Sequence, residues 1–261
     1  MLKKNKIFSF KNKNVLVVGA SKGLGESLSL SLAENNANLA LLSRSEQKLQ
    51  KLKKKLKNPS NHIFHYLDLE KINSIHDSLN IILKKFKHID IVYHAAGGGY
   101  GFKDALITQK KLTTLFQVNI GGAAEINRII LEKKNRNKIT RIIHVGSIAS
   151  YEAVGSVGYN TVKSSIVGYV RSLGREMYKK KAIITGIMPG GFEAPNNAMH
   201  RLKKKNFTAY NKFIKERLPR MKMGNVKEIL PLMLLLGTEF SDMMGGCMVP
   251  IDAGEGKSYI L

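Results

Sequence analysis

Short apolar runs alternate along this chain with stretches in which apolar residues recur at helical spacing. Runs that are apolar at consecutive positions are typical of parallel strands buried on both faces, and parallel strands need helical crossovers to connect them. The predicted strands are residues 15–18, 39–42, 62–67, 90–94, 141–145, 183–188 and 248–251. This alternation predicts the α/β class, as a doubly wound parallel β-sheet flanked by helices.

The segments between these strands carry the signals of helices. The predicted helices are residues 23–35, 46–56, 72–86, a helix from 112 that continues past 119 towards 133, and 159–178. Asn225 and Glu228 have the spacing of a capping box for a further helix that ends at Leu236, although Pro231 weakens its continuity. Pro250 indicates that the last strand lies at an edge of the sheet or at a strand end.

The stretch 192–222 follows the sixth strand and lacks strand alternation. It predicts a polar helical excursion over the site, and we call it the lid segment. The chain has no internal repeat and no linker, and 43% of its 261 residues are apolar, which suffices for one large core. We expect residues 1–261 to form a single domain.

Composition also bears on the compartment. No run approaches the roughly 20 apolar residues that a membrane span requires, and the apolar run after the Lys-rich start 1–13 is too short for a signal peptide. The single cysteine, Cys247, excludes an internal disulfide framework and fits a reducing compartment. A cytoplasmic protein is expected.

The chain is strongly basic, with 43 Lys and Arg against 19 Asp and Glu and a net charge of +24. Such a balance can indicate nucleic-acid binding, which would be strongly salt-dependent. The lysines are spread along the chain, however, and Lys and Asn are abundant together, as an AT-rich coding bias would produce. We therefore favour compositional drift with solvated lysines over a polyanion-binding surface.

A glycine-rich turn lies directly between the first strand and the first helix. Gly19, Gly23 and Gly25 would let the backbone turn sharply and approach a pyrophosphate, which the helix N-terminus attracts. A merely structural strand-to-helix turn is the alternative. The position of the turn favours a dinucleotide site.

The end of the second strand bears on which dinucleotide binds. An NAD site places a carboxylate there, whereas this chain has Ser43 and Arg44, with Lys22 in the glycine turn and no acid before Glu46. Arg and Lys complement a 2′-phosphate, so NADP(H) is predicted unless Arg44 is simply a solvated charge. Asp68 is placed either to accept from an adenine amino group or to cap a helix.

Ser147 follows the fifth strand, and Tyr159 and Lys163 lie four residues apart on one face of the next helix. Hydride addition to a carbonyl creates an oxyanion that needs a proton. A neighbouring cation lowers the pKa of a phenol towards the working range, and a serine hydroxyl can hold the substrate oxygen. In isolation, a Tyr–Lys pair with this spacing usually belongs to an ordinary helix surface. Here the pair follows Ser147 and the predicted nucleotide-binding half of the chain, and in that position it predicts a reductase.

The chain from about Asn14 to Gly254 resembles the short-chain dehydrogenase/reductase family, and within it the 3-oxoacyl-carrier-protein reductases. The resemblance implies a single-domain Rossmann fold. The motifs of the family fall on Gly19, Gly23 and Gly25, on residues 94–97, on Asn119, on Ser147, Tyr159 and Lys163, and on Pro189 and Gly190.

The resemblance implies a role for each matched residue. Asn119, Ser147, Tyr159 and Lys163 would be catalytic, with Lys163 also binding the nicotinamide ribose and Asn119 supporting a proton-relaying water chain. It further implies a homotetramer or homodimer and no metal. The expected cofactor-binding residues are Gly19, Ser21, Lys22, Gly23, Leu24, Gly25, Ser43, Arg44, Asp68, Leu69, Ala96, Gly97, Tyr159, Lys163, Pro189 and Gly190.

Two positions depart from the family pattern. His94 and Ala95 replace the usual asparagines, which weakens the expected polar support beside the fourth strand, and His94 is expected to be a satisfied strand-end residue rather than a second acid. Ala194 stands where a threonine often contacts the nicotinamide amide. These departures affect local cofactor contacts and not the chemistry.

No motif identifies the substrate. The lid segment is rich in Lys and Arg, which fits either an anionic substrate, such as an acyl-carrier thioester or a nucleotide-linked sugar, or a solvated surface. We expect reduction of a ketone, such as a 3-oxoacyl thioester, because NADP(H) suggests a biosynthetic direction. The alternatives are a sugar reductase and a non-catalytic NADP(H)-binding redox sensor, although a sensor would need no proton donor.

Overall fold

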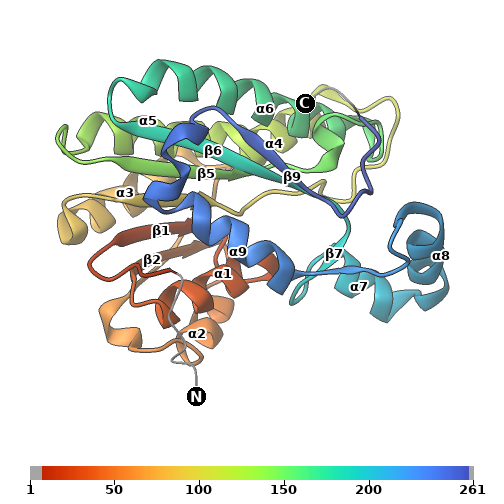
Figure 1. Ribbon diagram of the computed structural model, residues 1–261, viewed down its shortest axis with the longest axis horizontal. Coiled ribbons are helices and arrows are strands. Elements are labelled where there is room, and N and C mark those ends of the chain that lie inside the picture. The colour runs from red at the N-terminus through yellow and green to blue at the C-terminus, as the bar shows by residue number, and fades with distance from the viewer. Residues whose placement is uncertain (1–7, 259–261) are drawn as a thin grey trace.

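In the computed structural model, residues 8–258 are described, so the outermost residues of the predicted domain, 1–7 and 259–261, lie outside the described part. Seven strands form one parallel sheet in the order β3-β2-β1-β4-β5-β6-β9 (Figure 1). These strands are β1 (Asn14–Val18), β2 (Asn38–Ser43), β3 (Ile63–Tyr66), β4 (Ile91–His94), β5 (Thr140–Val145), β6 (Ala182–Pro189) and β9 (Met248–Ile251). The predicted doubly wound α/β fold is confirmed.

Helices cover both faces of the sheet. The helices of the two layers are α1 (Gly23–Glu34), α2 (Glu46–Lys53) and α9 (Val226–Leu236) on one face, and α3 (Ile72–Phe86), α4 (Gln109–Phe116), α5 (Gly122–Lys133) and α6 (Val157–Tyr178) on the other (Figure 1). In the described part, residues 8–258, no helix combines the length and apolar character needed to cross a membrane.

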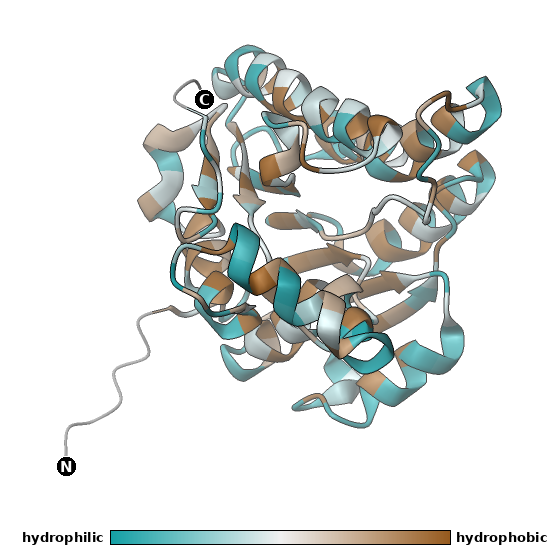
Figure 2. Cartoon of the chain, turned by 90° about the vertical axis from the view of Figure 1, so that its right-hand side faces the viewer, coloured by the Kyte–Doolittle hydropathy of each residue, from teal (hydrophilic) through white to brown (hydrophobic). Residues whose placement is uncertain are grey.

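Successive strand residues alternate between two hydrophobic cores. Val15 and Val17 of β1 pack with α1 and α9, whereas Leu16 and Val18 pack with α3, α5 and α6. Because side chains of a strand point to opposite faces in turn, a fully buried strand must be apolar at every position. In Figure 2 the strands are accordingly hydrophobic, while the helices carry hydrophilic outer faces.

Several predicted boundaries agree closely with the structure. Helix α3 has the predicted bounds, the capping box of Asn225 and Glu228 is formed, and α9 continues through Pro231. Within residues 8–258, strand β9, which contains Pro250, pairs only with β6 and lies at the edge of the sheet, so the predicted edge position is confirmed.

Two local features differ from the prediction. The long helix past Asn119 is interrupted by a π-helical turn, Gln117–Gly121, between α4 and α5. The lid segment contains the predicted helices, α7 (Ala198–Lys205) and α8 (Phe207–Arg217), but it also begins with the short strand β7 (Phe192–Glu193), which pairs with β8 (Gly224–Asn225) at its base. Both features depend on contacts that hydrophobic periodicity does not report.

The sheet order places the site. The chain runs outward from β1 through β2 to β3 and then returns to the other side of β1 to form β4. At such a reversal the loops after β1 and β4 diverge, which leaves a crevice at the carboxyl ends of the strands where parallel α/β folds bind ligands. The glycine turn directly follows β1 and so lies at this crevice.

Candidate active site

The glycine turn is folded tightly against its neighbours. A Cβ atom on Gly25 would lie 2.2 Å from the carbonyl oxygen of Gly19, and one on Gly19, whose φ is +89°, would lie 2.6 Å from the backbone nitrogen of Ala96. Leu24 is buried in the core beneath the turn. These contacts require glycine and bring the backbone of β1, α1 and the loop after β4 together, as a pyrophosphate cradle needs.

Hydrogen bonds tie the turn to two other segments. The hydroxyl oxygens of Ser21 and Ser43 lie 2.5 Å apart, which joins the turn to the end of β2. The backbone N–H of Gly23 donates to the carbonyl of Pro195 at 2.6 Å, so the start of the lid segment lies across the turn. Ala194, beside Pro195, is buried in the core and offers no polar side chain there.

Positive charge gathers at the mouth of the crevice. Partial desolvation lowers the pKa of Lys22, and repulsion from Arg201, Lys48 and Arg44 lowers it further. We call these four side chains the cation group. Mutual repulsion of this kind is relieved when an anion binds among the cations, so the residues present fit a phosphorylated nucleotide.

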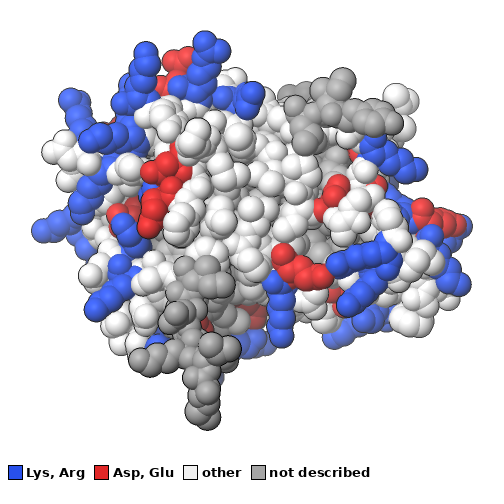
Figure 3. All heavy atoms as spheres, in the orientation of Figure 1, with Lys and Arg blue, Asp and Glu red and all other residues white. Residues whose placement is uncertain are grey.

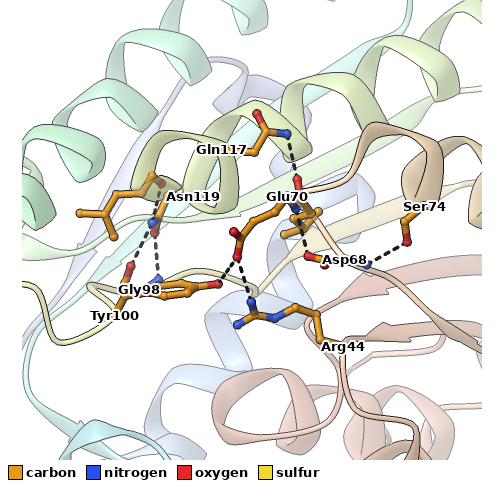
Figure 4. A network of polar contacts seen from close by, with 10 residues as sticks. Arg44, Asp68, Glu70, Ser74, Gly98, Tyr100, Gln117 and Asn119 are labelled. Atoms are coloured by element: carbon orange, nitrogen blue, oxygen red, sulfur yellow. Dashed lines mark hydrogen bonds and ion pairs between the residues drawn. The ribbon is translucent and has the colours of Figure 1, made fainter. Parts of the chain in front are cut away.

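The loop after β3 carries the next predicted contacts. The side chain of Asp68 accepts a hydrogen bond from the backbone N–H of Glu70 at 3.1 Å, so it stabilises its own loop and does not cap α3. The backbone carbonyl of Leu69 accepts from the Gln117 side chain at 2.8 Å (Figure 4). Arg44 forms an ion pair with Glu70 at 3.1 Å, a partner that the sequence did not indicate.

Asn119 is buried in the π-helical turn. Its side chain exchanges two hydrogen bonds of 3.0 Å with the backbone of Gly98 and donates a third, of 2.9 Å, to the carbonyl of Leu115 (Figure 4). A Cβ on Gly97 would lie 2.6 Å from the Asn119 side-chain oxygen and 3.7 Å from Nζ of Lys163. Asn119 therefore holds the loop after β4 against Lys163, and π-helical turns recur at functional sites.

Ser147, Tyr159 and Lys163 come together at the carboxyl end of β5. Nζ of Lys163 donates to the carbonyl of Val145 at 2.9 Å and lies 5.7 Å from the centre of the Tyr159 ring. Burial lowers the pKa of Lys163 to about 8. Burial also raises the pKa of the Tyr159 phenol, which the Ser147 side chain partly opposes. The structure thus places a protonated phenol between a hydroxyl and a buried amine.

A polar network that the sequence analysis missed lies beneath this group. The ring of His94 stacks on that of His144 at 4.5 Å, and Asn127 of α5 bonds to both rings, at 2.7 Å and 3.1 Å, and to the Tyr169 hydroxyl at 3.1 Å. Asn127 therefore supplies the polar support expected from asparagines at the end of β4. His94 nevertheless keeps one nitrogen, Nδ1, without a partner within residues 8–258.

The lid segment is held at two places. Its helices enclose a small apolar core around Tyr210, and they project beyond the rest of the chain in Figure 1. Arg217 at the end of α8 pairs with the buried carboxylate of Glu255 at 3.0 Å and donates to the carbonyl of Val154, in the loop before Tyr159, at 3.4 Å. The lid segment is therefore tied to the loop that precedes α6, the helix that carries the predicted proton donor.

Pro189 and Gly190 end β6 at the base of the lid segment. A cavity of about 390 Å³ opens there, lined by residues that include Gly190, Phe192, Arg220 and Asp252. None of Ser147, Tyr159 and Lys163 lines it, so this cavity lies beside the predicted catalytic side chains and not at them.

The surface charge is dispersed. On the face seen in Figure 3, Lys and Arg side chains gather towards the ends of the molecule, and uncharged surface separates them. This face carries no continuous basic tract of the kind that nucleic-acid binding uses. The distribution favours solvated lysines there.

Comparisons with known proteins place the chain. A profile of the short chain dehydrogenase family matches residues 13–225. An uncharacterized oxidoreductase of Staphylococcus epidermidis is 28% identical over 186 residues, which span 71% of this chain and 80% of that protein. The 3-oxoacyl-[acyl-carrier-protein] reductase FabG of Buchnera aphidicola subsp. Baizongia pistaciae is 25% identical over 247 residues, which span 93% and 96% of the two chains.

The fold is shared with solved structures. The Pseudomonas aeruginosa RhlG/NADP active-site complex superposes with a TM-score of 0.86 at 20% identity, covering 96% of this chain and 98% of that one. The chain belongs to the short-chain dehydrogenase family. It is an oxidoreductase of that family, similar at low identity to 3-oxoacyl-carrier-protein reductases.

Proposed function

We propose that this protein is an NADP(H)-dependent reductase that converts a ketone to a secondary alcohol, with Tyr159 as the proton donor. The observation that carries the proposal is the buried amine of Lys163, 5.7 Å from the Tyr159 ring. Buried lysines are rare and costly unless they serve a purpose, and this one lies beside a phenol and a serine hydroxyl at the ligand-binding edge of the sheet.

The side chains divide the chemistry among them. Ser147 donates a hydrogen bond to the carbonyl oxygen and orients it. The glycine turn and the cation group would hold NADPH, which would supply the hydride for the carbonyl carbon. Tyr159 gives its phenolic proton to the resulting oxyanion, and the ammonium of Lys163 stabilises the phenolate that remains. Asn119, which holds Gly98 and borders Lys163 through Gly97, positions the loop beside this amine and supports its reprotonation from solvent.

The preference for NADP(H) rests on the cation group. Partial burial and repulsion from Arg201, Lys48 and Arg44 lower the pKa of Lys22, and a 2′-phosphate bound among these cations would relieve the repulsion. The glycine turn, the loop after β3 and the backbone at Ala96 would complete the cofactor site. RhlG, a structural relative, has been solved with NADP.

A 3-oxoacyl thioester is the proposed substrate class. Its support is the similarity over 93% of this chain to a protein named as a 3-oxoacyl-carrier-protein reductase. The lid segment, tied by Arg217 to the loop before Tyr159, would cover such a substrate. We also propose that residues 1–261 act as one domain in a cytoplasmic homodimer or homotetramer.

Replacing Tyr159 with Phe tests the mechanism. The variant should lose at least about a thousandfold in the rate of NADPH oxidation with a 3-oxoacyl thioester, because general acid catalysis contributes on this order. It should still bind NADPH in a calorimetric titration. Tyr178→Phe, which removes a phenol at the far end of the same helix, is the matched control and should retain activity. A rate in the Tyr159→Phe variant within about tenfold of the unmodified protein would refute the role of the phenol.

Replacing Arg44 with Asp tests the cofactor assignment. The change removes a cation from the cation group and adds an anion, so the affinity for NADPH should fall by about tenfold or more while that for NADH changes little. Dissociation constants for both cofactors give the ratio directly. An unchanged ratio would contradict the assignment of Arg44 to the 2′-phosphate.

A further inference from the structure

Three side chains from three different loops meet at the mouth of the crevice. Nη1 of Arg44 and the hydroxyl of Tyr100 each lie 3.1 Å from the same carboxylate oxygen of Glu70. The guanidinium of Arg44 also lies over the Tyr100 ring, with Cζ 5.2 Å from its centre. Figure 4 shows the three side chains pointing towards one another. We call this arrangement the clasp.

The clasp crosses the crevice. Glu70 lies beyond the end of β3 and Tyr100 beyond the end of β4, and in the sheet these strands are separated by β2 and β1. Since neighbouring strands are about 4.8 Å apart, the bond between Glu70 and Tyr100 bridges loops that leave the sheet about 14 Å from each other. It therefore passes in front of the ends of β1 and β2, where the glycine turn and Arg44 lie.

The loop that carries Tyr100 has an unusual backbone conformation. Gly97, Gly98, Tyr100 and Gly101 all have positive φ, and Tyr100 itself has a φ of +53°, a left-handed conformation that non-glycine residues seldom adopt. Asn119 fixes the base of the loop through its two hydrogen bonds with Gly98. The phenol is thus directed towards Glu70 by a loop anchored at one end.

Glu70 is the acid that pairs with Arg44 of the cation group. Within residues 8–258, Lys22, Lys48 and Arg201 form no ion pair, and Arg44 pairs with Glu70. The side chains of Arg44 and Glu70 are 51% and 37% exposed, so both remain free to exchange partners with a ligand. A ligand phosphate that binds Arg44 would therefore have to compete with the carboxylate of Glu70, which is already paired with the Arg44 guanidinium.

We propose that Glu70 is a specificity-determining residue, which competes with the 2′-phosphate of the cofactor for Arg44 and so limits the preference for NADP(H) over NAD(H). The proposal rests on the proposed function, because it assumes that a nicotinamide dinucleotide occupies this crevice. The phosphate displaces the carboxylate from Arg44, and Glu70 then keeps only its bond to Tyr100. Ligands that lack a 2′-phosphate leave the Arg44–Glu70 pair intact.

Glu70→Gln is the discriminating variant. A glutamine side chain can still accept from Arg44 and Tyr100, so the clasp keeps its shape while its negative charge is removed. The probes are adenosine 2′,5′-bisphosphate and adenosine 5′-monophosphate, which differ only in the 2′-phosphate. Isothermal titration calorimetry should show the bisphosphate binding about three- to fivefold more tightly to Glu70→Gln than to the unmodified protein, as expected for an exposed ion pair. Binding of the monophosphate should change less than about twofold.

Glu132→Gln is the matched control. Glu132 also forms an exposed ion pair with an arginine, Arg128, at 2.7 Å, but on the outer surface of α5. The Glu132→Gln substitution removes the same charge and should leave the affinities for both nucleotides unchanged. Equal tightening of both nucleotides in Glu70→Gln, or no tightening of the bisphosphate, would overturn the proposal.

Tyr100→Phe separates the effect of the Glu70 charge from that of the Tyr100–Glu70 hydrogen bond across the crevice. This variant keeps the ring over Arg44 and the charge of Glu70 but removes the bond across the crevice. The ratio of the two affinities should stay that of the unmodified protein, and a rise in that ratio would overturn the role given to the Glu70 charge. If the unmodified protein binds neither NADPH nor either probe, the proposed function fails. If NADPH binds but the ratio of the two probe affinities is the same in Glu70→Gln as in the unmodified protein, only the present proposal fails.

Discussion

The buried imidazole of His94 makes the stability of this protein dependent on pH. Burial is the main cause that lowers the pKa of His94 to about 4, from an ordinary value of 6.5. Nε2 donates to Asn127, so a second proton would go to Nδ1, which has no partner within residues 8–258. Between about pH 6.5 and 4, His94 therefore stays neutral in the folded protein but gains a proton in the unfolded chain.

The sign and size of the effect follow from this difference. Above pH 6.5 both states hold a neutral His94, and the residue contributes no pH dependence. As the pH falls from about 6.5 to 4, only the unfolded chain gains the proton, so folded-state stability is lost. At about 1.4 kcal/mol for each unit of pKa difference, His94 alone should remove about 3 kcal/mol from the free energy of unfolding between pH 7 and pH 4.

Urea denaturation of the unmodified protein and of His94→Asn, at several pH values between 7 and 4, tests this expectation. Asparagine fits the site and does not titrate, so the difference in unfolding free energy between the two proteins should shift by about 3 kcal/mol in favour of the variant as the pH falls. His62 and His88, whose pKa values burial also lowers, contribute to both proteins and cancel in the difference. His144, which stacks on His94 and whose pKa burial and His94 both lower, is replaced by Asn in both proteins so that it does not enter the comparison. Parallel pH dependences of the two proteins would refute the reasoning.

Two further expectations concern turnover and the lid segment. Because burial lowers the pKa of Lys163 to about 8, the rate of ketone reduction should fall as the pH rises through about 8, where the amine loses the charge that stabilises the phenolate; a pH profile of kcat that is flat from 7 to 9 would contradict this role. Glu255→Gln removes the carboxylate that holds Arg217, so limited proteolysis should cut the lid segment several times faster, and an unchanged rate would show that this pair does not hold it.

The sequence predicted most of the framework because local physics determines it. Consecutive apolar residues identified the central strands, and the Asn225 capping box marked the start of α9. Pro250 placed β9 at the sheet edge because it has no N–H to donate to a further strand. The pairing of Tyr159 with Lys163 followed from their spacing of four residues in one helix, and Ser147 precedes that helix at the end of β5.

Features made by distant residues were not predicted. The π-helical turn at Asn119 depends on Gly98, which lies 21 residues earlier in the chain, and the bond between His94 and Asn127 joins a strand to a helix 33 residues away. The Arg44–Glu70 pair was missed because both residues lie in loops, where periodicity carries no information. Of the two roles predicted for Asp68, the helix cap is not formed, because its carboxylate accepts from the backbone N–H of Glu70 in its own loop, and the adenine contact stays a prediction.

The contacts found by the structure divide the control of the site between two sets of loops. Arg44, Glu70 and Tyr100 lie beyond the ends of β2, β3 and β4, where the proposed function would place the adenosine half of the cofactor. Arg217 ties the lid segment to Glu255 and to the loop before α6, on the side where the proposed function would place the ketone. Arg201 and Pro195 of the lid segment also reach the glycine turn, but within residues 8–258 Glu70 and Tyr100 form no hydrogen bond or ion pair with the lid segment. Substitutions in the clasp should therefore alter the ratio of nucleotide affinities and leave the KM for the ketone near its original value, because residues without shared contacts contribute nearly additively.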